Sequence, residues 1–348
     1  MESLETHESE HVAASIHWML PNKADGFLGL WESLIFDKNV KEDLLNFAST
    51  MLLFSKKEID QNIISCNRLI LLHGVPGTGK TSLAKALSQK LSIHMKKTYE
   101  ITHLFEINSH SLFSKWFSES GKLVLKMFEQ ILEVVENESN LVCVLIDEVE
   151  SLVVARENIS TSEPTDSVRV VNSVLTQLDR IKKFPNVLVI TTSNLLSNID
   201  SAFIDRADIV VNLPEPSPAA IFEIVVSVIH ELVLKGLIVR QSSEEQNDFS
   251  LDTISSFNYK KTTKDPLENS IIISAICEKA SGFSGRALRK LPFLAFALYL
   301  KKDTAILKEF LLAMISAVMY QQKSKKIFKQ NDSKLALNNG DLNAEKSN

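Results

Sequence analysis

Eight consecutive residues, 74–81, fit the pattern G-x-x-x-x-G-K-[ST] of a phosphate-binding loop. An apolar run at 69–72 comes shortly before them and predicts a buried strand. Glycines let such a loop curl so that backbone N–H groups converge on phosphates, and the helix that follows turns its positive dipole end toward the same anion. The predicted nucleoside triphosphate site consists of Gly74, Val75, Pro76, Gly77, Thr78, Gly79, Lys80, Thr81 and Ser82.

Two side chains of this loop have predicted roles in catalysis. Lys80 would place its positive charge on the β- and γ-phosphates, and Thr81 would offer its hydroxyl to Mg²⁺. The loop therefore combines an anion cradle, a point charge and a metal ligand. The alternative is a glycine turn formed by chance, which the strand, loop and helix context disfavours.

A second apolar run, at 141–146, ends in two adjacent carboxylates, Asp147 and Glu148. Because side chains alternate along a strand, these neighbours can serve different purposes. We expect Asp147 to hold the Mg²⁺ shell and Glu148 to orient and activate the attacking water. Without a phosphate loop upstream, the same pair would be interpreted as an ordinary turn.

Asn194 follows a third apolar run, at 187–192. In a parallel sheet, ligands lie at the carboxyl ends of the strands, where the phosphate loop and Asp147 would also emerge. We therefore expect Asn194 to position the water or to sense the γ-phosphate. The alternative role is that of a turn residue, for which asparagine is well suited.

Strands that alternate with helical patterns would position these residues. The alternation over 27–214 predicts an α/β domain with a parallel five-stranded sheet that helices cover on both faces. The expected strands are 69–72, 104–107, 141–146, 187–192 and 209–213.

The pattern changes at a cluster of three prolines, Pro214, Pro216 and Pro218. Residues 215–322 are predicted to form a smaller helical lid domain, interrupted by a polar loop insertion at 240–269. The polar leader at 1–26 and the tail at 323–348 are both expected to be disordered, because they contain too few apolar residues to form a packed core.

The overall composition limits the class of function. The formal net charge is −5, which argues against a surface built to bind nucleic acid. The three cysteines lie far apart without C-x-x-C spacing, so we expect a reducing compartment and predict neither a disulfide framework nor a zinc site. No apolar stretch has the length needed to cross a bilayer, and we expect the protein to be neither exported nor inserted in a membrane.

Together these motifs resemble the AAA+ ATPase superfamily, and longer segments resemble one of its families. EINSHSLFSKWFSESGK at 106–122, LIDEVESL at 145–152 and SGRALRKLPFL at 284–294 are similar to the pachytene checkpoint protein 2 family, also called the thyroid receptor-interacting ATPase. The resemblance extends over about 18–320. It implies ATP and Mg²⁺ as cofactors and a ring-shaped homo-oligomer, expected to be a hexamer.

The resemblance also implies roles for residues outside the phosphate loop. Arg206 matches the arginine finger, which would reach the γ-phosphate in the neighbouring subunit. Its alternative is a surface arginine paired with Asp205 or Asp208. Arg286 matches the sensor position on the lid, from which a cation contacts the phosphates, and Arg289 is a second candidate for that position.

Two further segments match the family. Lys115, Trp116 and Phe117 match the first pore loop, in which an aromatic residue of each subunit grips polypeptide in the central channel. Taken alone, the two aromatic residues could instead belong to the core. Residues 28–31 match the wall on the adenine side of the nucleotide, although apolar residues there would equally fit a core.

By resemblance, the clients would be HORMA-domain proteins, which the family converts from a closed to an open form during spindle checkpoint silencing and on meiotic chromosome axes. The expected location is the nucleus and cytoplasm, at chromosomes or kinetochores. The family's N-terminal domain, which engages substrate and adaptor, has no counterpart before Trp18. Two alternatives therefore stay open: a non-hydrolytic ring subunit that modulates full-length partners, and a nucleic-acid-dependent motor, which the acidic charge disfavours.

Overall fold

The computed structural model describes residues 14–19, 26–37, 39–109, 120–151, 165–239 and 268–344. The chain divides into two compact units, Met1–Pro214 and Glu215–Asn348. The division falls within the proline cluster at which the sequence pattern changes. Among the described residues, no helix combines the length and apolar character needed to cross a bilayer.

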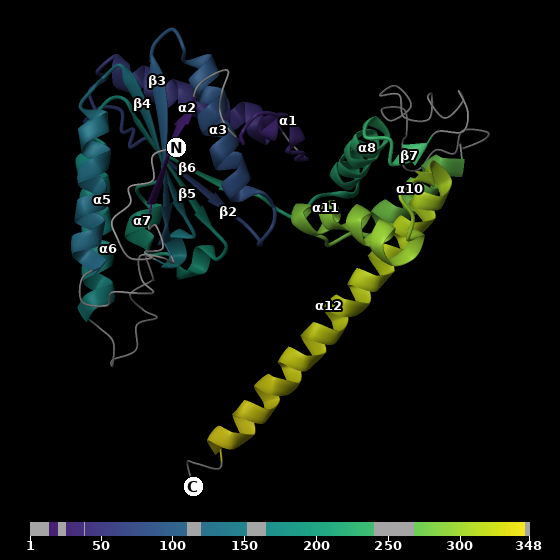
Figure 1. Ribbon diagram of the computed structural model, residues 1–348. Coiled ribbons are helices and arrows are strands. Elements are labelled where there is room, and N and C mark those ends of the chain that lie inside the picture. Colours follow the sequence, from purple (N-terminus) through teal and green to yellow (C-terminus); the bar gives the residue numbers. More distant parts are fainter. Residues whose placement is uncertain are drawn as a thin grey trace, which may run out of the picture. The chain divides into compact units, whose positions relative to one another are not determined.

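The first unit is built on a six-stranded sheet with the strand order β1-β3-β4-β5-β2-β6 (Figure 1). The five strands predicted from the sequence are present and mutually parallel. The bounds of all six are Ala14–Met19 (β1), Leu69–His73 (β2), Ile101–Asn108 (β3), Asn140–Asp147 (β4), Val187–Ser193 (β5) and Ile209–Asn212 (β6).

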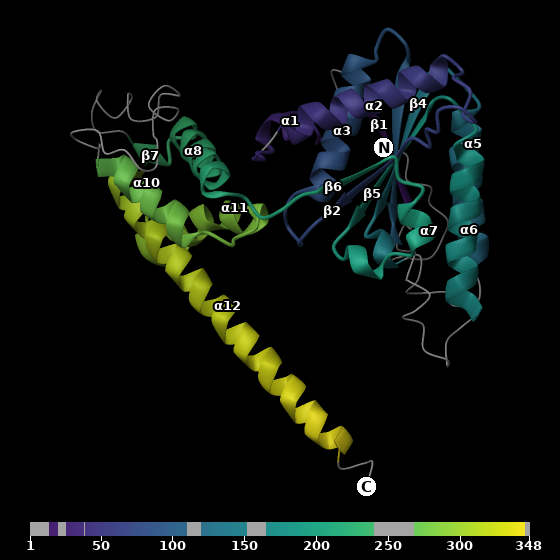
Figure 2. The same ribbon diagram turned by 180° about the vertical axis from the view of Figure 1, so that it is seen from behind.

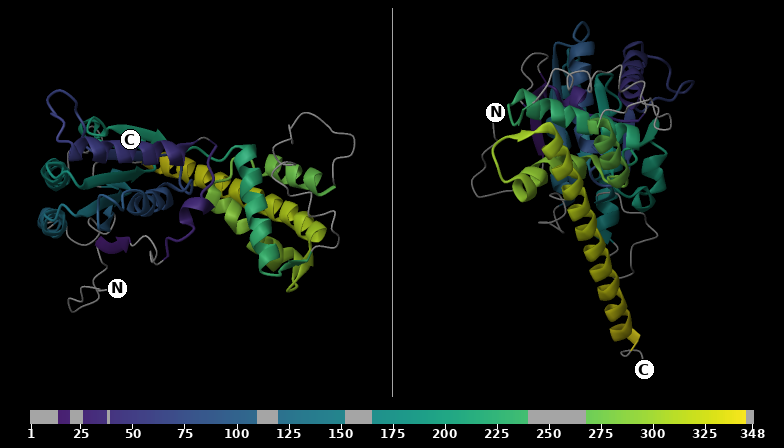
Figure 3. Two further views of the ribbon diagram at one scale, coloured as in Figure 1. Left: turned by 90° about the horizontal axis from the view of Figure 1, so that it is seen from above. Right: turned by 90° about the vertical axis from the view of Figure 1, so that its right-hand side faces the viewer.

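Helices cover both faces of this sheet, as the near-continuous apolar strands require. On one face, α5 (Ser120–Val135) and α6 (Thr165–Ile181) lie side by side and are seen end-on in the left panel of Figure 3. On the other face lie α2 (Val40–Lys56) and α3 (Lys80–His94) (Figure 2). Each pair packs its apolar side against alternate residues of the strands, which produces two separate cores.

The strand β1 corrects, for residues 14–19, the expectation that the leader at 1–26 is disordered. It pairs antiparallel with β3 at the edge of the sheet, and Met19 is buried. Glu106 on β3 contacts Lys85 of α3 at 2.7 Å and His17 of β1 at 3.5 Å. These contacts join β1 to partners far along the chain, so the polar composition of the leader did not reveal them.

Short elements connect the strands near their ends. They are α1 (Leu30–Ser33), η1 (Val149–Ser151), η3 (Leu196–Asn198) and α7 (Ser201–Ile204). Two of them, η1 and η3, follow β4 and β5, so they begin where the predicted catalytic residues lie.

The second unit is largely helical, as the sequence pattern predicts. Its elements are α8 (Pro218–Leu234), β7 (Ile238–Val239), α10 (Glu268–Lys279), α11 (Gly285–Leu294), the π-helix η5 (Ala295–Leu300), β8 (Ala305–Ile306) and α12 (Leu307–Ala344). The strands β7 and β8 form a two-stranded parallel sheet. Most of the predicted polar insertion lies outside the described residues, and its last two positions, 268 and 269, begin α10.

The helix α12 corrects the prediction of a disordered tail from residue 323, because it continues to Ala344. Its first turns are anchored by the buried residues Phe310 and Leu311, and a helix that is already nucleated extends at little cost. Lys325 also contacts the body of the unit, with its ammonium 4.4 Å from the Phe283 ring centroid and 3.3 Å from the Gly282 carbonyl.

Candidate active site

The phosphate loop lies between β2 and α3 and depends on glycine. Gly74, Gly77 and Gly79 have φ angles of 145°, 82° and 100°, which side chains of L-residues disfavour. At Gly74 the space is also closed, because an added Cβ would lie 2.2 Å from the Leu213 carbonyl oxygen. The loop backbone therefore passes against the end of β6 as only glycine allows.

The α3 helix begins at Lys80, at the end of the loop. Its N-cap residue is Gly79, and no side chain caps this end of the helix. The N-terminal backbone amides, which have no intrahelical acceptor, are thus suited to an anion. The Lys80 ammonium donates to the carbonyls of Gly74 at 2.8 Å and Val75 at 3.0 Å, so it is held across the loop.

Asp147 lies at the end of β4, close to the loop. Its Oδ1 accepts hydrogen bonds from the hydroxyls of Thr81, at 2.7 Å, and Thr192, at 2.5 Å. The Ser109 hydroxyl donates to the Asp147 backbone carbonyl. The structure thus brings together the two predicted Mg²⁺ ligands, Thr81 and Asp147.

Hard oxygen atoms of this kind suit Mg²⁺, which keeps several waters and takes few ligands from the protein. The described part of the chain contains no group of three or more His, Cys, Asp or Glu side chains arranged to hold a metal ion by themselves. The Thr81 hydroxyl and the Asp147 carboxylate, whose oxygens are 2.7 Å apart, fit a Mg²⁺ ion that would also bind the phosphates. Bound there, Mg²⁺ would neutralise charge that develops on the phosphoryl oxygens.

Glu148 follows Asp147 and is exposed, as a base that activates water must be. Its φ angle is 56°, an uncommon value for a residue with a side chain. The backbone N–H of Glu148 donates to the Thr192 hydroxyl at 3.1 Å. The Asn194 amide donates to Glu148 Oε1 at 3.5 Å, so the predicted base and the predicted sensor lie together.

Residues 28–31 were predicted to form the wall on the adenine side of the nucleotide, and the structure differs from this prediction in part. Leu28 is 67% exposed, and Trp31 is buried with the Lys41 and Lys90 ammonium groups each 5.7 Å from its ring centroid. The side chains that approach the loop are Leu34 and Phe36, which would lie 3.5 and 3.8 Å from a Cβ at Gly79. They come from the extended segment after α1, which has no periodic pattern to indicate its place.

Arg206 lies after α7 and is bound within its own chain. Its Nη1 donates to the Ala202 carbonyl at 2.7 Å, and its Nε and Nη2 donate to the two carboxylate oxygens of Asp179 on α6, at 3.3 and 3.1 Å. The sequence alternative named Asp205 or Asp208 as its partner, which is wrong. Asp208 instead accepts hydrogen bonds from the backbone of Asn67 and Leu69.

Two further predicted groups belong to other parts of the chain. Arg286 is exposed in the first turn of α11 in the second unit, after the N-cap Ser284, and its contact with a phosphate stays a prediction. The same holds for Arg289, whose pKa is lowered by burial. The pore-loop residues Lys115, Trp116 and Phe117 lie outside the described residues.

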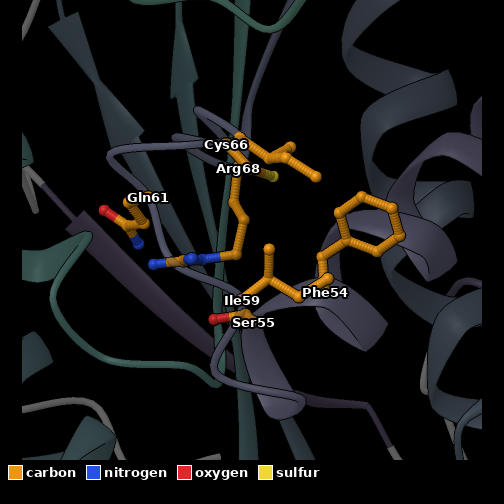
Figure 4. A pocket seen from close by; sticks show the side chains of 7 residues that line it. Phe54, Ser55, Ile59, Gln61, Cys66 and Arg68 are labelled. Carbon is orange, nitrogen blue, oxygen red and sulfur yellow. The ribbon is translucent and has the colours of Figure 1, made fainter.

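A small pocket lies at the opposite end of β2 from the phosphate loop. Figure 4 shows the Arg68 side chain among the lining residues, which include Gln61, Ile59 and Cys66. The Arg68 guanidinium donates to the carbonyls of Val187, Lys182 and Phe184 and is almost fully buried. It therefore joins the residue before β2 to the segment that connects α6 with β5, and this pocket is separate from the nucleotide site.

Comparison with known proteins decides the family. Residues 70–215 match the model of the ATPase family associated with various cellular activities (AAA), and residues 217–322 match the TRIP13-like AAA+ ATPase lid C-terminal domain. The chain is 50% identical over 332 residues to the pachytene checkpoint protein 2 homolog of Xenopus tropicalis, covering 95% of this chain and 75% of that protein. The chain belongs to the pachytene checkpoint protein 2 family. It is thus an AAA+ ATPase that binds a nucleotide.

One more homolog of the pachytene checkpoint protein 2 family and two solved structures are also similar to the chain. The human homolog is 48% identical over 320 residues, covering 92% of this chain and 72% of that protein. A solved structure of PCH-2 from C. elegans is 40% identical with a TM-score of 0.76, covering 91% of this chain and 78% of that one. An E. coli HORMA:CdnC:Trip13 complex has a TM-score of 0.61 at 17% identity, covering 86% of this chain and 93% of that one, and shows a shared fold.

Sequence reasoning missed several residues of the site. Thr192 and Ser109 hold Asp147, Asp179 holds Arg206, and Glu150 accepts a hydrogen bond from the Asn194 backbone at 2.9 Å. Glu150 had a signal within the sequence, since it is a third carboxylate two positions after Glu148. The other three residues, Thr192, Ser109 and Asp179, belong to no motif that marks them in the sequence, and the packing of strands and helices brings them to the site.

Proposed function

We propose that this ATPase uses ATP and Mg²⁺ to remodel other proteins, with HORMA-domain proteins as clients that it converts from a closed to an open form. The observation on which the proposal rests is that Lys80, Thr81, Asp147 and Glu148 lie at the phosphate loop and the end of β4 in an arrangement that can support ATP hydrolysis. The TRIP13-like lid supports this client class, because an E. coli protein described as Trip13 is found in a complex with a HORMA protein.

In this mechanism, the phosphate loop and the start of α3 bind the phosphates, and Lys80 places its charge on them. Asp147 and Thr81 would hold Mg²⁺. Glu148 accepts the proton of the attacking water, while Asn194 holds the Glu148 carboxylate in position. Arg206 would reach the γ-phosphate of the adjacent subunit, so hydrolysis depends on assembly of a ring, which we propose to be a hexamer.

Pulling would be the task of Trp116, with Lys115 and Phe117 beside it, and Arg286 would couple the lid to the nucleotide. We place the activity in the nucleus and cytoplasm, at chromosomes or kinetochores, where it would serve spindle checkpoint silencing and meiotic recombination control. An adaptor could deliver the client.

The test measures phosphate release by the purified chain, alone and with a HORMA-domain protein, single-stranded DNA or an unrelated folded protein. We expect release that the HORMA-domain protein stimulates several-fold and that Glu148→Gln abolishes. A matched Trp116→Ala variant should hydrolyse ATP but fail to open the client. The mass of the particle, measured with and without ATP, should show a ring.

Other results would contradict the proposal in distinct ways. Stimulation by DNA would indicate a nucleic-acid-dependent motor. ATP binding without release, at every protein concentration, would indicate a ring subunit that modulates active partners. A single protomer in ATP would exclude every role that needs a neighbouring subunit.

A further inference from the structure

Glu150 lies on a short turn directly after the predicted catalytic carboxylates. The turn is the 3-10 helix η1, in which the Ser151 N–H donates to the Glu148 carbonyl at 2.9 Å. Its first residue, Val149, is fully buried in the core beneath α5 and α6. One backbone hydrogen bond and the burial of Val149 therefore hold the turn that carries Glu150.

From this turn, Glu150 reaches across to the loop after β5. Its Oε1 accepts the backbone N–H of Asn194 at 2.9 Å. A hydrogen bond from a backbone amide to a carboxylate is stronger than one between neutral groups. Its Oε2 is buried and has no hydrogen-bond partner among the described residues. Within that part of the chain, this carboxylate therefore makes its hydrogen bond to Asn194 through Oε1.

Besides the bond from the Thr192 hydroxyl to Asp147, three hydrogen bonds join the ends of β4 and β5. The Glu148 N–H donates to the Thr192 hydroxyl, the Asn194 N–H donates to Glu150, and the Asn194 amide donates to the Glu148 carboxylate. The first two bonds use the backbone and fix the two segments relative to each other. The third joins the predicted sensor to the predicted base, and at 3.5 Å it is long. A long bond is sensitive to small displacements of either partner.

We propose that Glu150 is a positioning residue for ATP hydrolysis. By holding the Asn194 backbone, it keeps the Asn194 amide against Glu148 and so maintains the orientation of the base toward water. This inference rests on the proposed role of Glu148 as the base. Among the described residues, the side-chain hydrogen bond of Glu150 is to Asn194 and not to the phosphate loop, so its effect should fall on the chemical step and not on the binding of nucleotide.

Two conservative variants distinguish the effect of the side-chain length of Glu150 from the effect of its charge. Glu150→Gln keeps an oxygen at the same distance but removes the charge, and Glu150→Asp keeps the charge but is one methylene too short. We expect Glu150→Gln to retain kcat within about threefold, and Glu150→Asp and Glu150→Ala to lose about tenfold or more. The KM for ATP and the affinity for a fluorescent ATP analogue should change by less than about twofold.

A double-mutant cycle with Asn194→Ala tests whether the effect passes through that residue. We expect Glu150→Ala to add nothing to Asn194→Ala, because the amide that it positions is already absent. An exposed glutamate on α5, Glu133→Ala, controls for the change in net charge and should leave kcat unchanged. Thermal unfolding of each variant shows whether the first unit is folded, and Glu150→Gln keeps the test valid if Glu150→Ala unfolds.

The proposal is overturned if Glu150→Gln is as impaired as Glu150→Asp, if the effects of Glu150→Ala and Asn194→Ala multiply, or if the loss appears in KM and not in kcat. Failure of the proposed function gives a different result, because the unmodified chain would then release no phosphate and Glu148→Gln would change nothing.

Discussion

Arg206 and Asp179 form a two-pronged ion pair within one chain, with the guanidinium Nη2 3.1 Å from one carboxylate oxygen and Nε 3.3 Å from the other. Burial acts to raise the pKa of Asp179, but hydrogen bonds from Arg206 and Lys182 hold that pKa below its ordinary value. A guanidinium that is already held in this way would lose little further side-chain freedom on contact with a phosphate. Asp179 therefore prepares Arg206 for its proposed role at a neighbouring subunit.

Mixing of two inactive variants tests that role. Arg206→Ala keeps Glu148, and Glu148→Gln keeps Arg206, so each variant alone should bind ATP but lose nearly all hydrolysis. Random assembly of equal amounts would create complete seams at about a quarter of the subunit boundaries, and phosphate release should recover to a comparable fraction. If Arg206 acted within its own chain, the mixture would stay as inactive as its parts.

The Thr192 hydroxyl should support catalysis through Asp147 and Glu148. It donates to the carboxylate of the first and accepts from the N–H of the second, so Thr192→Val removes both contacts without changing the volume. We expect a loss of kcat of about tenfold and a stability loss of about 1–2 kcal/mol, measured by phosphate release and urea unfolding.

The neighbouring residue is a matched control for this variant. Thr191 is also buried on β5, but its hydroxyl donates to the Ile70 carbonyl and contacts neither catalytic carboxylate. Thr191→Val should reduce stability by a similar amount and leave kcat unchanged. Equal losses of activity in both variants would show that Thr192 acts only through the stability of the strand.

Local sequence patterns were sufficient to predict much of the candidate active site. The phosphate loop is a contiguous motif, and the five parallel strands are apolar runs separated by helical periods, so both were predicted and the fold is confirmed. Thr192 and Asp147 are 45 positions apart, and only the pairing of Ile146 with Thr191 brings them together. Contacts that depend on register cannot be read from composition or spacing.

The disorder predicted for residues 14–19 and 323–344 was wrong for the same reason. The strand β1 is stable because its backbone bonds to β3 and because Met19 enters the core that α2 and α3 cover. The tail continues α12, whose earlier turns are already packed. Low hydrophobicity predicted disorder in both segments, but tertiary contacts and an existing helix override this local signal.

Gly74→Ala should damage the site through the backbone. The added Cβ would lie 2.2 Å from the Leu213 carbonyl oxygen, and φ would stay at 145° only with strain, so the loop must shift. We expect a stability loss of about 1–3 kcal/mol and at least a tenfold loss of ATP affinity. Gly236→Ala is the control, because its φ is 72° but nothing lies within 4 Å of the added atom. It should cost stability alone.

His103 should make the free energy of unfolding depend on pH. It lies on β3 opposite Trp18 of β1 and is 9% exposed, its Nδ1 has no hydrogen-bond partner among the described residues, and the Trp18 ring contacts it edge-on. Burial lowers its pKa from 6.5, so the folded chain resists a proton that the unfolded chain accepts. Stability from this group is therefore complete above the unfolded pKa and is lost as pH falls below it, with a slope of at most about 1.4 kcal/mol per pH unit. Urea unfolding of the protein and of His103→Leu between pH 7.5 and 5.5 measures the difference, and parallel curves would contradict this origin.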